Sequence, residues 1–169
     1  KNIIGGWKYD IIDQGLKVNM PDVNASIGLA QIKKYQSTLL PERKKIFSFY
    51  INFFQKFKWA ILPIYKDKFR ESSYHLFLLR IKNIDENERD KIINLVSKNN
   101  IGLNVHYFPM PMLTLFKRLN YNIKDYPMTY NLYKNEISLP VYNNLSKKSL
   151  IKICNSIVES YSKVCHDKV

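Results

Sequence analysis

Hydrophobic side chains recur at helical spacing in two long segments of the chain. Between residues 46 and 57 they follow the order i, i+3, i+4, i+7, i+8 and i+11, which predicts a helix with one broad apolar face. That face comprises Ile46, Phe49, Tyr50, Phe53, Phe54 and Phe57. The second face comprises Leu150, Ile153, Cys154, Ile157, Val158 and Tyr161. We expect core helices there, the first beginning at Pro41-Glu42 and the second capped by Ser146.

Two more helices are indicated by their terminal signals. Pro21 and Asp22 favour a helix start, because Pro suits the first helical turn and Asp complements the helix dipole. The small residues at 25, 26 and 28 suggest that this helix is packed closely on more than one side. Asp85 and Glu88 resemble a capping box for a helix over 86–99. Asn99-Asn100 would end that helix in the left-handed conformation.

Strand-like segments are few and lie among the helices. The candidates are residues 59–64, 73–81, 101–107 and 137–139. The first nineteen residues read as an irregular lead-in with extended pieces around residues 7–12. This order predicts an α/β chain built as an α+β layer, with a small mixed or antiparallel sheet covered by helices.

Composition is that of an ordinary globular domain. The chain has 169 residues, of which 46% are hydrophobic and 24% charged, and this length suits one domain. No apolar run reaches the ~18 residues of a membrane-spanning helix, so we expect no membrane partner. Two cysteines, Cys154 and Cys165, and three scattered histidines form neither a disulfide framework nor a metal pattern. We therefore expect no metal site and a cytoplasmic protein.

The net charge of +13 introduces nucleic acid as a possible partner, because basic domains attract phosphate backbones. However, 22 of the 27 basic residues are Lys, amid abundant Asn, Ile, Tyr and Phe, as an AT-rich genome would encode. The lysine pairs are also scattered along the chain. A basic nucleic-acid-binding module is therefore kept only as a lesser alternative.

The candidate chemistry lies in two short segments. Lys17 and Asn19 place a cation and an amide donor just before the helix N-terminus at residue 22, where backbone N–H groups favour an anion. A solvated lysine and a helix-capping asparagine are the alternative interpretation. His106 and Tyr107, at the end of a predicted strand, offer hydrogen bonds to a ligand, although a histidine satisfied at a sheet edge is common.

The segment 15–32 carries a specific resemblance. It reads GLKVNMPDVNASIGLAQI and resembles the signature G-y-K-y-N-M-t-D-i-q-A-A-i-G-l-a-Q-L of the DegT-type sugar-nucleotide aminotransferases, which use pyridoxal phosphate (PLP). Further segments resemble that family in the same order: Arg43, residues 73–77, residues 100–109, Tyr126-Pro127 and residues 137–142. The resemblance runs from Trp7 to about Tyr161.

The resemblance implies an aspartate-aminotransferase-like, fold-type I architecture of which this chain is the small C-terminal domain. Residues 1–21 would be the lead-in and cofactor-loop segment, residues 22–169 the small α/β domain, and the large PLP-binding domain would be absent from the chain. The Schiff-base lysine of the family lies in the large domain. Lys1 imitates it in sequence, but the family separates that lysine from its loop by about twice the spacing found here. We therefore assign no catalytic residue and expect the isolated chain to be inactive.

The resemblance also implies roles for the two candidate segments. In the family the signature loop reaches the PLP phosphate of the neighbouring subunit, so Lys17 or Asn19 is the expected cofactor-binding residue. Many members have Asn-x-Arg at residues 17–19; the Lys-x-Asn form resembles the branch acting on 4-keto sugar nucleotides. His106 and Tyr107 match a substrate-binding His-Tyr pair. The family's following histidine is replaced here by Met110-Pro111.

The implied function is transfer of an amino group from glutamate to a keto sugar nucleotide, for surface polysaccharide or lipopolysaccharide synthesis. The working unit would be a homodimer. The alternative implied by a partial chain is a non-catalytic fragment, or a split-gene product that supports a partner chain.

Overall fold

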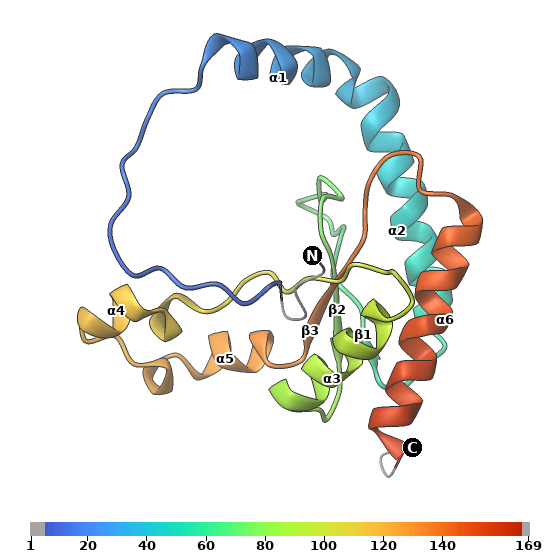
Figure 1. Cartoon of the computed structure of the whole chain (residues 1–169). Coiled ribbons are helices and arrows are strands. Elements are labelled where there is room, and N and C mark those ends of the chain that lie inside the picture. Colours follow the sequence, from blue (N-terminus) through green and yellow to red (C-terminus); the bar gives the residue numbers. More distant parts are fainter. Residues whose placement is uncertain (1–5, 167–169) are drawn as a thin grey trace.

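A small antiparallel sheet lies at the centre of the computed structural model, which describes residues 6–166 (Figure 1). The strand order is β1-β2-β3, with β1 at Ala60–Ile61, β2 at Phe77–Ile81 and β3 at Glu136–Leu139. Both strand pairs are antiparallel. The predicted α/β class with a small sheet covered by helices is confirmed. Lys1 lies outside the described residues.

Helices predicted from hydrophobic spacing and capping signals are present at the expected places. The longer helical segments are α1 (Asp22–Lys34), η1 (Tyr35–Leu39, a π-helical turn), α2 (Leu40–Phe54), α3 (Glu86–Ser97) and α6 (Lys147–Val164). Short helices η2 (Met110–Met112), α4 (Thr114–Arg118), η3 (Ile123–Asp125) and α5 (Pro127–Tyr133) connect α3 to β3. The turn η1 joins α1 to α2 without an intervening loop.

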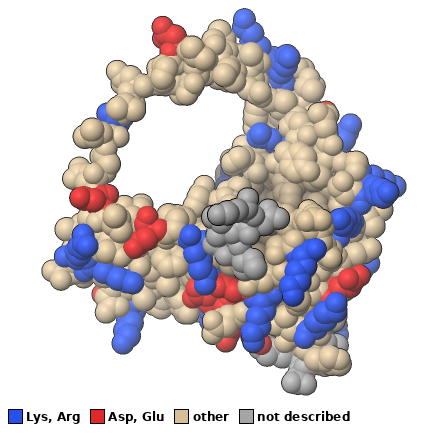
Figure 2. All heavy atoms as spheres, in the orientation of Figure 1, with Lys and Arg blue, Asp and Glu red and all other residues tan. Residues whose placement is uncertain are grey.

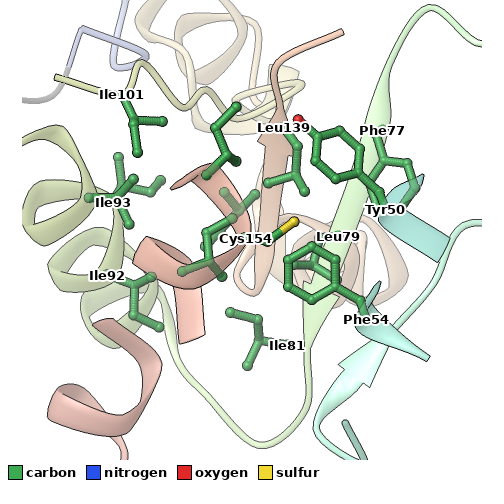
Figure 3. Close-up of a cluster of buried hydrophobic side chains, with 14 of the residues drawn as sticks. Tyr50, Phe54, Phe77, Leu79, Ile81, Ile92, Ile93, Ile101, Leu139 and Cys154 are labelled. Carbon is green, nitrogen blue, oxygen red and sulfur yellow. The ribbon is translucent and has the colours of Figure 1, made fainter. Parts of the chain in front are cut away.

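The core forms where one face of the sheet meets α2, α3 and α6 (Figure 3). Side chains alternate along β2, so Phe77, Leu79 and Ile81 are fully buried while the residues between them are half-buried. Opposite them on β3, Leu139 pairs with Phe77 and Ile137 with Leu79. The buried helix residues that complete the core include Tyr50, Phe54, Ile92, Ile93 and Cys154.

The capping predictions are confirmed in detail. Asp85 and Glu88 form a reciprocal capping box, with each side chain accepting from the other's backbone N–H at 2.8 and 2.9 Å. Asn100, just beyond α3, has a φ of 57°, the left-handed conformation expected after a helix. The Ser146 hydroxyl accepts from the backbone N–H of Ser149 at 3.1 Å. Such caps each contribute about 1 kcal/mol.

The predicted strand over 101–107 is wrong, and the predicted strands over 59–64 and 73–81 are shorter than expected. In 101–107 only Asn104 forms a bridge, to Ser138 of β3. The backbone N–H groups that follow donate to side chains: that of Val105 to the Asn104 carboxamide, and that of His106 to the Glu136 carboxylate. Because these donors are used by side chains, no ladder of backbone hydrogen bonds continues here.

Part of the chain that precedes α2 stands away from this core. Residues 13–34, which we call the arm, run as an extended loop into α1 and enclose an open space beside the body of the molecule (Figures 1 and 2). No residue of α1 is buried. The expectation that α1 is closely packed on more than one side is therefore not met by contacts within residues 6–166.

Candidate functional site

The loop that carries Lys17 and Asn19 is extended and exposed on the arm. Its apolar neighbours are exposed too: 95% of the Leu16 surface is accessible. The loop leads into α1, whose N-cap residue Pro21 supplies no side-chain hydrogen bond. The first-turn N–H groups of α1 are thus left without a side-chain cap, and Lys17 and Asn19 precede this turn in the sequence. This set of donors is suited to a phosphate dianion.

The base of the arm is attached to α4. The Asp10 carboxylate accepts from the backbone N–H of Thr114 at 2.8 Å and from its hydroxyl at 2.5 Å. These hydrogen bonds hold the pKa of Asp10 below its usual value. The Leu115 N–H donates to the Ile11 carbonyl at 2.8 Å, and Arg118 donates to the Ile12 carbonyl at 3.1 Å. The arm therefore leaves the body from a fixed point.

His106 and Tyr107 lie two and three residues beyond the Asn104 bridge. Nδ1 of His106 lies 2.7 Å from Oγ of Ser138, and Nε2 lies 3.5 Å from Nδ2 of Asn104. The Tyr107 ring meets the His106 ring edge-on, with centroids 4.8 Å apart, and 63% of Tyr107 is exposed. Burial, and secondarily nearby His75, lowers the pKa of His106 and so favours the neutral imidazole.

A buried carboxylate lies beneath His106. Glu136 accepts from the His106 backbone N–H at 3.0 Å and from the Ser138 hydroxyl through a short hydrogen bond. Desolvation raises the pKa of Glu136 to about 7, although both hydrogen bonds oppose that change. Glu136, Ser138 and His106 thus form one connected hydrogen-bond network.

Arg89 of α3 supports this network from below. Its fully buried guanidinium donates to the carbonyls of Tyr133 and Glu136 at 3.0 and 3.3 Å. The charge is balanced by Asp90, whose Oδ1 lies 2.7 Å from Nε, and more distantly by Glu86. The guanidinium also lies over the Tyr133 ring, 4.7 Å from its centroid. Arg89 therefore holds the backbone at Glu136 in place.

Glu136, Ser138 and Arg89 belong to the site but were not predicted from the sequence. The available signal was the polar pair at i and i+2 in β3, which alternates with Ile137 and Leu139. That pattern predicts a strand with one polar face. It does not reveal that both polar residues are buried beneath the loop at residues 104–107.

Of the predicted site residues, the structure brings His106 and Tyr107 together but leaves Lys17 and Asn19 apart from them. Across residues 6–166, no hydrogen bond or ion pair joins the arm loop to the histidine pair. The loop instead follows the far side of the open space in Figure 1. The two segments meet only if another part of the protein, or another subunit, brings them together.

Neither a metal-binding cluster nor a membrane-spanning helix is present in the part of the chain that the structure describes. There, no three His, Cys, Asp or Glu side chains gather closely enough to hold a metal ion. Of the helices between residues 6 and 166, none combines the length and apolarity required to cross a membrane.

Comparison with known proteins identifies the class. The family model of the DegT/DnrJ/EryC1/StrS aminotransferases matches residues 5–158, nearly the whole chain. This chain belongs to the DegT/DnrJ/EryC1/StrS aminotransferase family. Enzymes of this family use PLP as their cofactor.

Individual relatives agree with the family match. The spore coat polysaccharide biosynthesis protein SpsC of Bacillus subtilis is 30% identical over 90% of this chain and 40% of its own length. A UDP-4-amino-4,6-dideoxy-N-acetyl-beta-L-altrosamine transaminase of Campylobacter jejuni is 27% identical over 94% of this chain and 41% of its own length. The chain thus spans about two-fifths of the curated relatives that it matches.

Solved structures show the same correspondence. Spr1654 of Streptococcus pneumoniae, assigned as a sugar aminotransferase, superimposes in its PMP form with a TM-score of 0.82 and 36% identity. The match covers 95% of this chain and 40% of that one. A PLP form of the same relative matches equally well. The three-stranded sheet and its helices therefore correspond to a segment of a fold-type I aminotransferase.

The donor set on the arm fits the phosphate end of PLP. A lysine ammonium, an asparagine amide and helix N–H groups without a side-chain cap are all groups able to donate to phosphate oxygens. Chemistry on the cofactor ring, for which PLP acts as an electron sink, requires groups that bind its ring nitrogen and its aldehyde. Of these tasks, the donors on the arm suit only the binding of the phosphate.

Proposed function

We propose that this chain is the C-terminal portion of a PLP-dependent aminotransferase that transfers an amino group from glutamate to a keto sugar nucleotide. The product would enter surface polysaccharide or lipopolysaccharide synthesis. Family membership supports this assignment, as do the similarities to SpsC, a spore coat polysaccharide biosynthesis protein, and to the Campylobacter nucleotide-sugar transaminase. In this proposal residues 1–21 are the lead-in and cofactor loop, residues 22–169 the small domain, and the large domain lies outside this chain.

The observation that carries the proposal is the exposed arm. It presents phosphate-binding groups at Lys17 and Asn19, and it also presents apolar side chains that nothing in residues 6–166 covers. These are Leu16, Val18, Met20, Val23, Ile27, Leu29 and Ile32. Exposed apolar surface of this extent is typical of an interface. A homodimer in which the arm of one subunit reaches the cofactor site of the other accounts for both features.

Each candidate residue has a task in this arrangement. PLP, when bound, would supply the electron sink for moving the amino group. Lys17 or Asn19 would hold the cofactor phosphate by a charge-assisted or amide hydrogen bond. His106 and the exposed Tyr107 would bind the sugar nucleotide on the substrate side. Arg89 and Glu136 would keep the His106 backbone in place.

The direct test is an assay of the protein that contains this chain. We expect glutamate-dependent conversion of a UDP-linked or dTDP-linked 4-keto sugar into an amino sugar, with 2-oxoglutarate as coproduct. Sedimentation at micromolar concentration should show a dimer. A monomer with full activity would contradict the cross-subunit arm, and absence of conversion with every keto sugar nucleotide would contradict the activity.

The isolated 169-residue chain should be inactive, because we assign no Schiff-base lysine to it. After incubation with PLP, borohydride reduction and mass spectrometry should find no single stoichiometric PLP-modified lysine. A unique adduct at Lys1 would overturn this assignment. If the intact gene product also lacked activity yet bound a partner chain, the non-catalytic alternative would replace our proposal.

Nucleic-acid binding is a less favoured alternative. On the face shown in Figure 2, Lys and Arg side chains are spread over several elements, with acidic side chains among them. DNA titration at two salt concentrations tests the point, because phosphate-driven binding falls steeply as salt rises. A cytoplasmic location is part of our proposal and agrees with the free, buried thiol of Cys154.

A further inference from the structure

The hydrogen-bond network of Glu136, Ser138 and His106 can hold its protons in more than one arrangement. Ser138 has one hydroxyl proton and lies between two acceptors, the Glu136 carboxylate and Nδ1 of His106. The direction in which it donates therefore decides which imidazole nitrogen carries the proton. We propose that Glu136, acting through Ser138, sets the tautomer of His106 and so decides whether Nε2 accepts or donates a hydrogen bond at the substrate side. The substrate part of this inference rests on the function proposed above.

With Glu136 ionised, the hydrogen bonds have only one consistent direction. The Ser138 hydroxyl donates to Oε1 of Glu136, so its oxygen must accept from Nδ1–H of His106. Nε2 then carries the free lone pair. The amide Nδ2 of Asn104, which can only donate, lies 3.5 Å from Nε2 and agrees with that assignment. In this state Nε2 would accept a hydrogen bond from a sugar hydroxyl.

With Glu136 protonated, the direction reverses. The His106 backbone N–H always needs an acceptor and is bonded to Oε2, so the added proton must lie on Oε1. Oε1–H then donates to Ser138, and Ser138 donates to Nδ1. The network gains one proton in total: Nε2 takes it from solvent, while the Nδ1 proton moves to Ser138 and the Ser138 proton moves to Glu136. Nε2–H is now a donor.

The surroundings allow both states of Glu136. Its carboxylate is buried, and the charge of Arg89 is engaged by Asp90 and Glu86. Arg80 is the partner of Glu136 in the β2–β3 register and is only half-buried. Around His106, the neighbouring titratable groups are His75 and Tyr107. The pKa of Glu136, raised to about 7 by burial, places the change near neutral pH.

The test is nitrogen-15 NMR of the histidine rings in the 169-residue chain, which requires neither cofactor nor substrate. Two-bond and three-bond couplings distinguish the two neutral tautomers and the cation, and His106→Gln assigns the signals. At pH 8 we expect a preference of about tenfold for Nδ1–H, the ratio that one buried hydrogen bond supports. Toward pH 6 the Nε2–H form should increase. An Nε2–H tautomer throughout this range would overturn the proposal.

Variants separate this role from simple packing. In Glu136→Gln the carbonyl must accept from the His106 N–H, so the amide NH2 faces Ser138 and mimics the protonated acid. Between pH 6 and pH 8 we expect the neutral His106 ring to be Nε2–H throughout, not merely less ordered. Ser138→Ala should leave the tautomer ratio independent of pH. Ser156→Ala, another buried serine, which accepts from Asn99, is the matched control and should behave as wild type.

The outcomes distinguish this inference from the proposed function. If Glu136→Gln or Ser138→Ala did not fold, the pH dependence of the wild-type chain would still decide. A wild-type-like tautomer ratio in folded Glu136→Gln would overturn the proposal, whatever the enzyme assay shows. Conversely, a confirmed tautomer change in a protein without aminotransferase activity would leave the network established and only its substrate unassigned.

Discussion

Nη1 of Arg89 donates to the backbone carbonyl of Glu136 at 3.3 Å, while the Glu136 carboxylate accepts from the Ser138 hydroxyl and the His106 backbone N–H. The buried cation thus fixes the position of the glutamate without forming an ion pair with its side chain. This arrangement explains why the pKa of Glu136 is raised although an arginine is close: desolvation outweighs the distant charge. Two consequences can be measured on the isolated chain.

The first concerns stability against pH. The pKa of Glu136 is about 7 in the folded chain and 4.5 when unperturbed. Below pH 4.5 both states are protonated; above it the unfolded chain loses its proton first, so stability falls as pH rises through 7. The loss should approach roughly 3 kcal/mol. Urea unfolding at pH 5 and pH 8 measures it.

Because the pKa of His106 is lowered, its contribution to stability rises with pH, opposite to that of Glu136. A variant is therefore needed to separate the contribution of the glutamate. Glu136→Gln should remove this decrease in stability with rising pH. The difference in the free energy of unfolding between the variant and wild type should therefore shrink or change sign between pH 5 and pH 8. Equal pH dependence in the two proteins would contradict the raised pKa.

The second consequence concerns Arg89. Its guanidinium satisfies two buried carbonyls and neutralises Asp90, so Arg89→Ala leaves several buried polar groups without a partner. We expect a loss of about 3–5 kcal/mol in the free energy of unfolding. Arg89→Lys should be intermediate at best, because an ammonium cannot reproduce the planar fork. Lys91→Ala, at an exposed position of the same helix, should change stability by less than about 0.5 kcal/mol.

A third prediction concerns the cofactor loop in the full-length enzyme. If Lys17 binds the PLP phosphate, Lys17→Ala should weaken PLP retention by ~10- to 150-fold, the equivalent of ~1.5–3 kcal/mol for a charge-assisted contact. Asn19→Ala would then change cofactor affinity little. If Asn19 is the ligand, the order reverses. Lys33→Ala, at the other end of α1, is the control, and unchanged PLP dissociation in both loop variants would remove this loop from the cofactor site.

A fourth prediction concerns the base of the arm. Asp10→Ala removes the acceptor of both Thr114 hydrogen bonds and should loosen the attachment of the arm to α4. Hydrogen exchange of the Thr114 and Leu115 amides should accelerate by about tenfold, as expected for loss of one net hydrogen bond. Asp13→Ala, in which the lost acceptor serves only the adjacent Gln14, should leave those amides unchanged. Acceleration spread over α6 as well would indicate global destabilisation instead.

Sequence alone determined the elements whose causes are local. The apolar spacing between Leu150 and Tyr161 requires α6, and the reciprocal side chains of Asp85 and Glu88 define the start of α3. The family could also be inferred from sequence, because residues 15–32 resemble its signature and further segments that resemble it follow in the same order. These signals need no knowledge of distant contacts.

Tertiary structure decided what depends on residues far apart in the chain. Residues 101–107 have strand-like composition, but Glu136 takes the backbone donor of His106 from thirty positions away and the ladder stops. The burial of Glu136 and Ser138 likewise follows from the loop laid over β3, not from their own pattern. Conversely, α1 carries apolar residues that predict burial, yet none of its residues is buried by contacts within residues 6–166. Local sequence shows only that a segment has apolar side chains that favour burial. Whether they are buried depends on which other surfaces pack against them in the assembled protein.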